Sequence, residues 1–329
     1  MKHVKTIQDY LQYVYYSFKH SEINKFDPKI KRICLSESSH CPEVYSQGML
    51  GSCVVNAFCF ILKYKLNTMH QCNSIQEYFK PSRYFLYHYS CLESYGLIGI
   101  VNIFTNTEHK GGGGTCPFLL LNTINKHGIL NEQLWESDNI KQFAYYKMDP
   151  ISIEKKNSYE YVIPKKTFLT KIAKFFNKKY IPIGLAVDKN ELSDANKWKH
   201  KIIFKNINID NNQIINFKHY LQNNNPIMIC MSIDGEQMNN YSDNIFFSGS
   251  SENPIQISLT NKCEFKLNCL HCMVIVGYND KYNAFKVLNS WGKNWGYGGY
   301  CYMSYDLFNL SLVKKNLVTS ATIIDRILI

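Results

Sequence analysis

Residues 47–53 read QGMLGSC, so an amide side chain, two glycines and a thiol come directly before a helical pattern. From Cys53 onward, apolar side chains recur at helical spacing (Val54, Ala57, Phe58, Ile61, Leu62), which predicts a helix with Ser52 as its N-cap. A free thiol is mostly protonated at neutral pH, because its pKa is about 8.5. The dipole of a helix N-terminus stabilises a thiolate by only about 1 kcal/mol. The stretch therefore predicts a cysteine nucleophile that needs a cationic partner from elsewhere in the chain.

Two downstream segments supply that partner. His271 opens the apolar run HCMVIVGY at residues 271–278, which is typical of a buried strand, and Asn289 opens NSWGKNWG at residues 289–296. An imidazolium beside a thiolate stabilises it and can later move a proton. The order Cys, His, Asn is thus that of a thiol-dependent catalytic triad.

Together, these three motifs resemble the papain-like cysteine proteases, which include the cathepsins. Further stretches extend the similarity over about residues 41–310, with a gap in the middle. They are PSRYFLY at 81–87, Gly114-Thr115 through Gly128-Ile129, PIM at 226–228 and GGYCYM at 298–303. Leu50 stands where secreted cathepsins usually have a disulfide cysteine, and Val54 where they usually have tryptophan. A Leu-Gly-Ser-Cys-x-x-Asn-Ala version is similar to a microbial subset of the family.

The resemblance implies a role for each motif residue. Cys53 would be the nucleophile and His271 the base and later the acid, while Asn289 would orient the imidazole. The Gln47 side chain and the Cys53 backbone N–H would form the oxyanion hole, where fixed donors contribute roughly 3 to 4 kcal/mol to catalysis. Trp291 would shield the bond between His271 and Asn289 from water.

The glycine run at residues 111–114 could also be a phosphate-binding loop, because successive backbone N–H groups can face an anion. No Gly-Lys-Ser/Thr follows it, so a P-loop is not supported. The resemblance instead makes Gly114 and Thr115 part of a substrate cleft, with residues 111–113 as a flexible connector.

The predicted fold class is α+β, with a helical half, an antiparallel barrel-like half and the active site between them. We expect four segments. They are an N-terminal extension (1–40), a helical half with the nucleophile (41–149), an insertion or elaborated linker (150–213), and a β-rich half with the histidine and asparagine (214–329). The extension is amphipathic around residues 7–18 and is interpreted as a short propeptide or lid, or as a helix packed on the barrel. An insertion is expected because Cys53 and His271 are about 70 residues further apart than the about 130–150 typical of papain-type enzymes. Residues 236–268 are a second candidate for added chain.

Composition narrows the function classes. The 329 residues are 45% hydrophobic, which is enough for a large core, and the 12 cysteines are scattered irregularly, so we expect mostly reduced, buried thiols. The net charge is +11, but only three of the 37 basic residues are arginine, which argues against specific nucleic-acid recognition. The lysine bias is typical of AT-rich coding, as in giant viruses of protists.

The sequence shows no signal-peptide core and no apolar run approaching the about 18 residues of a membrane span. We therefore expect a soluble protein without classical secretion, cytoplasmic or, from a viral source, packaged in the virion. Cys263, Cys269, His271 and Cys272 lack standard zinc spacing, and adjacent strand residues point to opposite faces. We expect no metal and no organic cofactor.

The predicted function is hydrolysis of peptide bonds in a protein or peptide substrate, through a thioester on Cys53. The alternatives are acyl transfer to an amine and a catalytically silent relative that binds peptides. Oligomeric state, subsite preference and the choice between endopeptidase and exopeptidase action do not follow from the sequence.

Overall fold

The computed structural model describes residues 24–48, 51–69, 79–87, 89–90, 114–132, 189–233, 256–257, 269–309 and 317–328. The helices are α2 (Cys53–Met69), α4 (Pro117–His127), α8 (Lys189–Asn196) and α9 (Gln213–Gln222), with short 3-10 helices η1 (Leu35–Glu37) and η4 (Tyr305–Phe308). The strands are β1 (Arg32–Cys34), β2 (Ile202–Asn206), β3 (Ile227–Ile233), β4 (Gln256–Ile257), β5 (Cys269–Asn279), β6 (Ala284–Leu288), β7 (Tyr300–Ser304) and β8 (Val318–Ile327).

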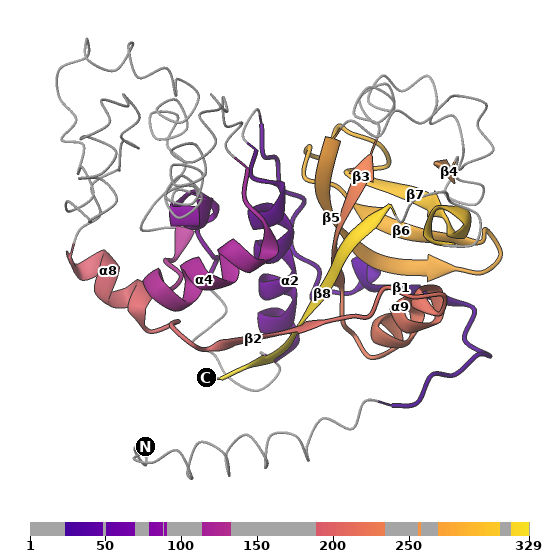
Figure 1. The fold of residues 1–329 in the computed structure, drawn as a ribbon, viewed down its shortest axis with the longest axis horizontal. Coiled ribbons are helices and arrows are strands. Elements are labelled where there is room, and N and C mark those ends of the chain that lie inside the picture. The colour runs from indigo at the N-terminus through magenta and orange to yellow at the C-terminus, as the bar shows by residue number, and fades with distance from the viewer. Residues whose placement is uncertain are drawn as a thin grey trace, which may run out of the picture.

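The strands form one sheet beside the helices. Its order is β2-β8-β3-β5-β6-β7-β4, and β1 pairs with β5 outside this path. Every pair is antiparallel except β4 with β7. In Figure 1, α4 and α8 lie to one side, the sheet lies to the other, and α2 stands between them. The α+β class predicted from the sequence is confirmed.

Strand β5 is the centre of the sheet. It pairs with β3 along its first part, with β6 along its second, and with β1 at residues 277–279. Residues 271–276 are all buried, and both α2 and α9 contact the strand. Because successive side chains of a strand point to opposite faces, a strand covered on both sides is apolar throughout. The strand predicted from the run at 271–278 is confirmed.

Helix α2 is buried almost all round. Its side chains from Val54 to Leu62 are all buried, and the helix contacts β3, β5 and β8 as well as α4. A helix whose first half is buried on every face has to lie inside a domain. The helix predicted to begin at Cys53 is confirmed, and its central position fixes the location of that residue.

The described part of the N-terminal extension packs on the sheet side of the molecule. The Asp27 N–H donates to Gln222 Oε1 (2.9 Å) at the end of α9, and β1 follows five residues later. Where β1 pairs with β5, a Cβ on Gly277 would lie 2.4 Å from the carbonyl oxygen of Ile33, so only glycine fits there. The amphipathic stretch at 7–18 lies outside the described residues, and the domain limit at residue 40 stays a prediction.

Residues 189–206, inside the segment predicted as an insertion or linker, connect the two sides. α8 contacts α4, and β2 pairs with β8 at the end of the sheet. The turn after α4 requires a glycine at residue 128. Gly128 has φ +78°, and a Cβ there would lie 1.7 Å from the carbonyl oxygen of Ala195 in α8. Residues 150–188 and most of 236–268 lie outside the described residues.

Candidate active site

Cys53 is the first residue of α2 and is half-buried. The first hydrogen bond of the helix runs from the Asn56 N–H to the Ser52 carbonyl oxygen (2.9 Å), so Ser52 occupies the predicted N-cap position. The Asn56 side-chain Nδ2 also donates to that oxygen (2.9 Å) and to Ser52 Oγ (3.0 Å). The residue before the thiol is therefore held by the first turn of the helix.

Helix α2 brings Cys53 towards the start of β5. The neighbouring strand residue of His271 is Cys272, a fully buried thiol. Burial raises the pKa of Cys272, and a hydrogen bond with Cys230 and the charges of Cys230 and Cys53 raise it further. Helix α2 contacts β5, and Cys53 itself packs against the buried core.

His271 and Asn289 form a direct hydrogen bond inside the protein. His271 Nε2 lies 2.8 Å from Asn289 Oδ1, and the two residues are only 5% and 1% exposed. Asn289 follows β6, and its own N–H donates to the Gly299 carbonyl oxygen (2.9 Å). The backbone of Asn289 is thus tied to the turn that leads into β7.

A second hydrogen bond fixes the orientation of the Asn289 amide. The Ser290 N–H donates to the same Oδ1 (2.8 Å), so rotating the amide by 180° would set this donor against an NH₂ group. Oδ1 is therefore the atom that faces the imidazole. Because Oδ1 can only accept, His271 Nε2 carries a hydrogen, and Nδ1 is the ring nitrogen that can exchange a proton.

The surroundings of His271 act on its charge in two directions. Burial lowers the pKa of His271, and the hydrogen bond to Asn289 opposes this effect. The net shift is downward, so the imidazole taken alone favours its neutral form. A thiolate at Cys53 is the kind of negative charge that would stabilise the imidazolium there.

Trp291 covers the imidazole. The two ring centroids are 5.1 Å apart with the planes tilted by 37°, and Trp295 packs edge-on against Trp291 at 5.5 Å. The position agrees with the predicted shielding of the bond between His271 and Asn289. Trp295 itself is buried and packs in the core.

Gln47 is attached to the segment that follows Asn289. Its N–H donates to the Ser290 carbonyl oxygen (2.8 Å), and the Ser290 hydroxyl donates to its side-chain Oε1. A further bond joins the Gly292 N–H to the Tyr45 carbonyl oxygen (3.1 Å). With the acceptor end of the Gln47 amide held in this way, the donor end is the part suited to an oxyanion.

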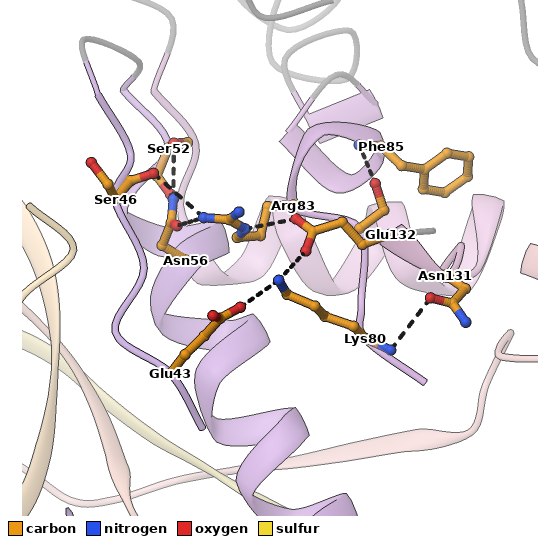
Figure 2. A network of polar contacts seen from close by, with 10 residues as sticks. Glu43, Ser46, Ser52, Asn56, Lys80, Arg83, Phe85, Asn131 and Glu132 are labelled. Atoms are coloured by element: carbon orange, nitrogen blue, oxygen red, sulfur yellow. Dashed lines mark hydrogen bonds and ion pairs between the residues drawn. The ribbon is translucent and has the colours of Figure 1, made fainter. Parts of the chain in front are cut away.

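Several partners in this region have no predicted role. Ser290 lies inside the NSWG motif but was not singled out, although it holds both Gln47 and Asn289. Arg83 lies in the PSRYFLY motif, and it joins Glu132, Lys80 and Glu43 in a network of charges beside Asn56 (Figure 2). A rare arginine within a family motif was the one signal for it in the sequence.

The remaining predicted positions are less closely connected to this cluster. Gly114 is exposed and Thr115 is half-buried; they precede Cys116, the N-cap of α4. Their place in a substrate cleft stays a prediction. Within the described ranges, no three His, Cys, Asp or Glu side chains gather as a metal site requires. Cys263 lies outside those ranges. None of the described helices is long and apolar enough to cross a bilayer.

None of the eight cysteines whose side chains the structure describes forms a disulfide. Of these eight, Cys59, Cys272 and Cys301 are buried, while Cys116 is exposed. The expectation of mostly buried thiols therefore holds for only part of the set.

Comparisons with known proteins agree on one family. The model of the papain family cysteine proteases matches residues 138–321, more than half of the chain, including His271 and Asn289 but not Cys53. An uncharacterized peptidase C1-like protein, L477 of Acanthamoeba polyphaga mimivirus, is 25% identical over 283 residues, which are 85% of this chain and 69% of that protein.

Two solved structures are also similar. Xylellain, a cysteine protease from Xylella fastidiosa, superposes with a TM-score of 0.55 at 20% identity, covering 93% of this chain and 88% of its own. The Carica candamarcensis cysteine protease CMS1MS2 gives a TM-score of 0.47 at 15% identity, with 89% and 96% covered. The likeness to xylellain shows the fold.

Proposed function

Because this chain belongs to the papain family of cysteine proteases, we propose that it is a peptidase that cleaves peptide bonds through a thioester on Cys53. The observation that supports this most is the buried pair of His271 and Asn289, joined at 2.8 Å with the amide orientation fixed by the Ser290 N–H. The bond to Asn289 occupies Nε2 and leaves Nδ1 for proton exchange, which a merely structural histidine does not need. This arrangement directs the imidazole towards acid–base work.

In the acylation step, Cys53 Sγ attacks the carbonyl carbon of the scissile peptide bond. The proton of the thiol resides on His271 Nδ1 and passes to the leaving amine as the carbon–nitrogen bond breaks. Water then attacks the thioester, His271 takes a proton from that water, and the carboxylic acid leaves as the thiol forms again. Asn289 keeps the imidazole in position through both steps.

The tetrahedral intermediates carry a negative oxygen that needs fixed donors. The Gln47 amide and the Cys53 N–H are the proposed pair, in keeping with the hydrogen bonds between Gln47 and Ser290. Donors fixed before the reaction stabilise the transition state without reorganising during it.

The substrate is proposed to be a protein or peptide that extends past Gly114 and Thr115. Backbone groups at a glycine can approach an extended chain closely, which suits binding that does not depend on sequence. The lysine-rich composition and the similarity to the mimivirus protein support a viral source, for which the host cytoplasm or the virion would be the site of action.

The first experiment treats full-length protein with an epoxide inhibitor selective for papain-like thiol proteases and locates the adduct by intact-mass and peptide mass spectrometry. One stoichiometric adduct on Cys53 is the expected result. Cys116 serves as an internal control for the selectivity of labelling. It is an exposed free thiol, so a reagent that alkylates thiols in general would modify it as well. Adducts on Cys116 but not on Cys53 would contradict the proposal.

The same reagent separates the alternatives. Labelling only after residues 1–40 are removed would identify a zymogen, whereas no labelling in either form would favour a silent peptide-binding protein. Turnover of a peptide substrate with and without added amines then distinguishes hydrolysis from acyl transfer. Cys53→Ala and His271→Ala are each expected to abolish turnover while leaving the thermal unfolding midpoint close to that of the wild type.

A further inference from the structure

A network of four charged side chains lies next to the start of α2. Arg83 Nε is 2.9 Å from Glu132 Oε1, Lys80 Nζ is 2.7 Å from Glu132 Oε2, and Lys80 also pairs with Glu43. Two cations therefore balance two carboxylates. Glu132 is only 7% exposed, and a carboxylate this deeply buried requires paired cations.

Arg83 reaches beyond this charge network to both ends of the stretch at residues 47–53. Its Nη1 lies 3.4 Å from the carbonyl oxygen of Ser46, the residue before Gln47. The same nitrogen lies 3.3 Å from Asn56 Oδ1, on the side chain whose Nδ2 holds Ser52. Figure 2 shows the guanidinium between Ser46 and Asn56 on one side and Glu132 on the other.

These contacts lie next to the two proposed oxyanion donors. One proposed oxyanion donor is the Gln47 side chain, immediately after Ser46, and the other is the Cys53 N–H, immediately after Ser52. Between them the chain passes through Gly48, which has φ +57°. A glycine-containing segment does not fix the separation of its own ends, so contacts outside it have to do so.

Arginine has the shape that this position needs. Its planar fork donates in several directions at once, so Nε can pair with Glu132 while Nη1 faces the two oxygens. Its guanidinium carbon also lies 4.4 Å from the centroid of the Tyr45 ring, which holds the plane from a second side. A lysine at residue 83 would supply the charge but only one compact donor group.

We propose that Arg83 is a positioning residue for the oxyanion hole, which sets the distance between the Gln47 amide and the Cys53 N–H by binding Ser46 and Asn56 together. This inference rests on the proposed peptidase function and adds a residue to it. Arg83 touches neither the substrate nor the thiol in this role. Its loss should therefore lower the rate of the step that builds the oxyanion and leave the nucleophile intact.

The test compares Arg83→Gln with Lys80→Gln in the full-length protein. Both changes remove one cation that pairs with Glu132, but only Arg83 contacts Ser46 and Asn56. Since losing a whole oxyanion donor lowers kcat about 10²- to 10³-fold, Arg83→Gln is expected to lower kcat by about tenfold to a hundredfold on an amide substrate, with KM nearly unchanged. Lys80→Gln is expected to stay within about threefold of the wild-type kcat.

A second readout separates positioning from general damage. Iodoacetamide alkylates the Cys53 thiolate by displacement at a saturated carbon, with no oxyanion, so its rate and pH profile should be the same in Arg83→Gln and wild type. The double variant Arg83→Gln with Gln47→Ala should be no slower than Gln47→Ala alone, because Arg83 acts through that amide. If Arg83→Gln does not fold, as judged by thermal unfolding, Arg83→Lys replaces it in all three measurements.

The outcomes lead to distinct conclusions. The inference is overturned by alkylation that slows in parallel with turnover, by an equal loss of kcat in Lys80→Gln, or by losses at Arg83 and Gln47 that multiply. Wild-type protein that turns over no peptide, either at full length or after removal of residues 1–40, would overturn the proposed function and this inference with it. Active wild-type protein with the expected pattern would establish Arg83 in this role.

Discussion

Replacing Asn289 by alanine tests the acid–base part of the proposed site most directly. The change removes the Oδ1 acceptor that lies 2.8 Å from His271 Nε2, and so leaves the buried N–H of His271 without this acceptor. A hydrogen bond to a charged group contributes about 1.5–3 kcal/mol, and each 1.36 kcal/mol is tenfold in rate, so kcat/KM should fall about tenfold to 150-fold. This loss is smaller than that expected for Cys53→Ala or His271→Ala.

The same change should also move the pH profile, and the direction follows from the surroundings of His271. The bond to Asn289 raises the pKa of His271 against the effect of burial, so its removal lowers this pKa further. The active thiolate and imidazolium pair is then lost at a lower pH, and the alkaline limb of kcat/KM shifts to lower pH. Stopped-flow or plate assays of a fluorogenic peptide between about pH 4 and 10, which spans the ordinary pKa values of both groups, measure both effects.

Asn289→Asp is the matched control for this experiment. It keeps oxygen acceptors for His271 and Ser290, and Asn289 Nδ2 has no hydrogen-bond partner among the described residues, so no described bond is lost. A carboxylate beside the imidazolium should raise the pKa of His271 and move the alkaline limb to higher pH. Alkaline limbs that coincide in the wild type and both variants would refute this account of the pair.

Three further predictions concern other parts of the molecule. Gln47→Ala should lower kcat about 10²- to 10³-fold while iodoacetamide alkylation of the active thiol continues at the wild-type rate; a normal kcat would remove Gln47 from the oxyanion hole. Gly128→Ala should lower the free energy of unfolding by about 2 kcal/mol or more, because the new Cβ meets the Ala195 carbonyl oxygen at 1.7 Å and φ is +78°; urea unfolding measures this, and an unchanged midpoint would contradict it. Deleting residues 1–40 removes β1 and should lower the thermal midpoint by about 5 °C or more relative to a deletion of 1–23, which keeps β1; equal midpoints would show that the strand adds no stability.

The sequence predicted the local features of the candidate site well, because their signals are local. The helix from Cys53 and the strand from His271 follow from apolar patterns within about 15 residues, the range over which such periodicity is read. The resemblance of these motifs to the papain-like cysteine proteases then implied the α+β fold.

Features that depend on long-range pairing were not accessible in the same way. The bond between Gln47 and Ser290 joins residues 243 positions apart, and Arg83 and Glu132 are 49 positions apart. An isolated glutamate in a sequence is usually a solvated surface residue, and nothing nearby marks Glu132 as buried. β1 has only three residues, too few to show any periodicity, and it owes its structure to the edge that β5 offers.

The path of the chain between the two sides has a consequence for how the protein unfolds. The polypeptide contributes β1 to the sheet first, then builds α2 and α4 on the helical side, and returns through β2 to the far end of the same sheet (Figure 1). Neither side is therefore a continuous piece of chain that could be expressed alone with its hydrogen bonds complete. Unfolding of the helical side would therefore disturb both β1 and β2. We expect the described parts to unfold in one cooperative transition rather than as two separate domains.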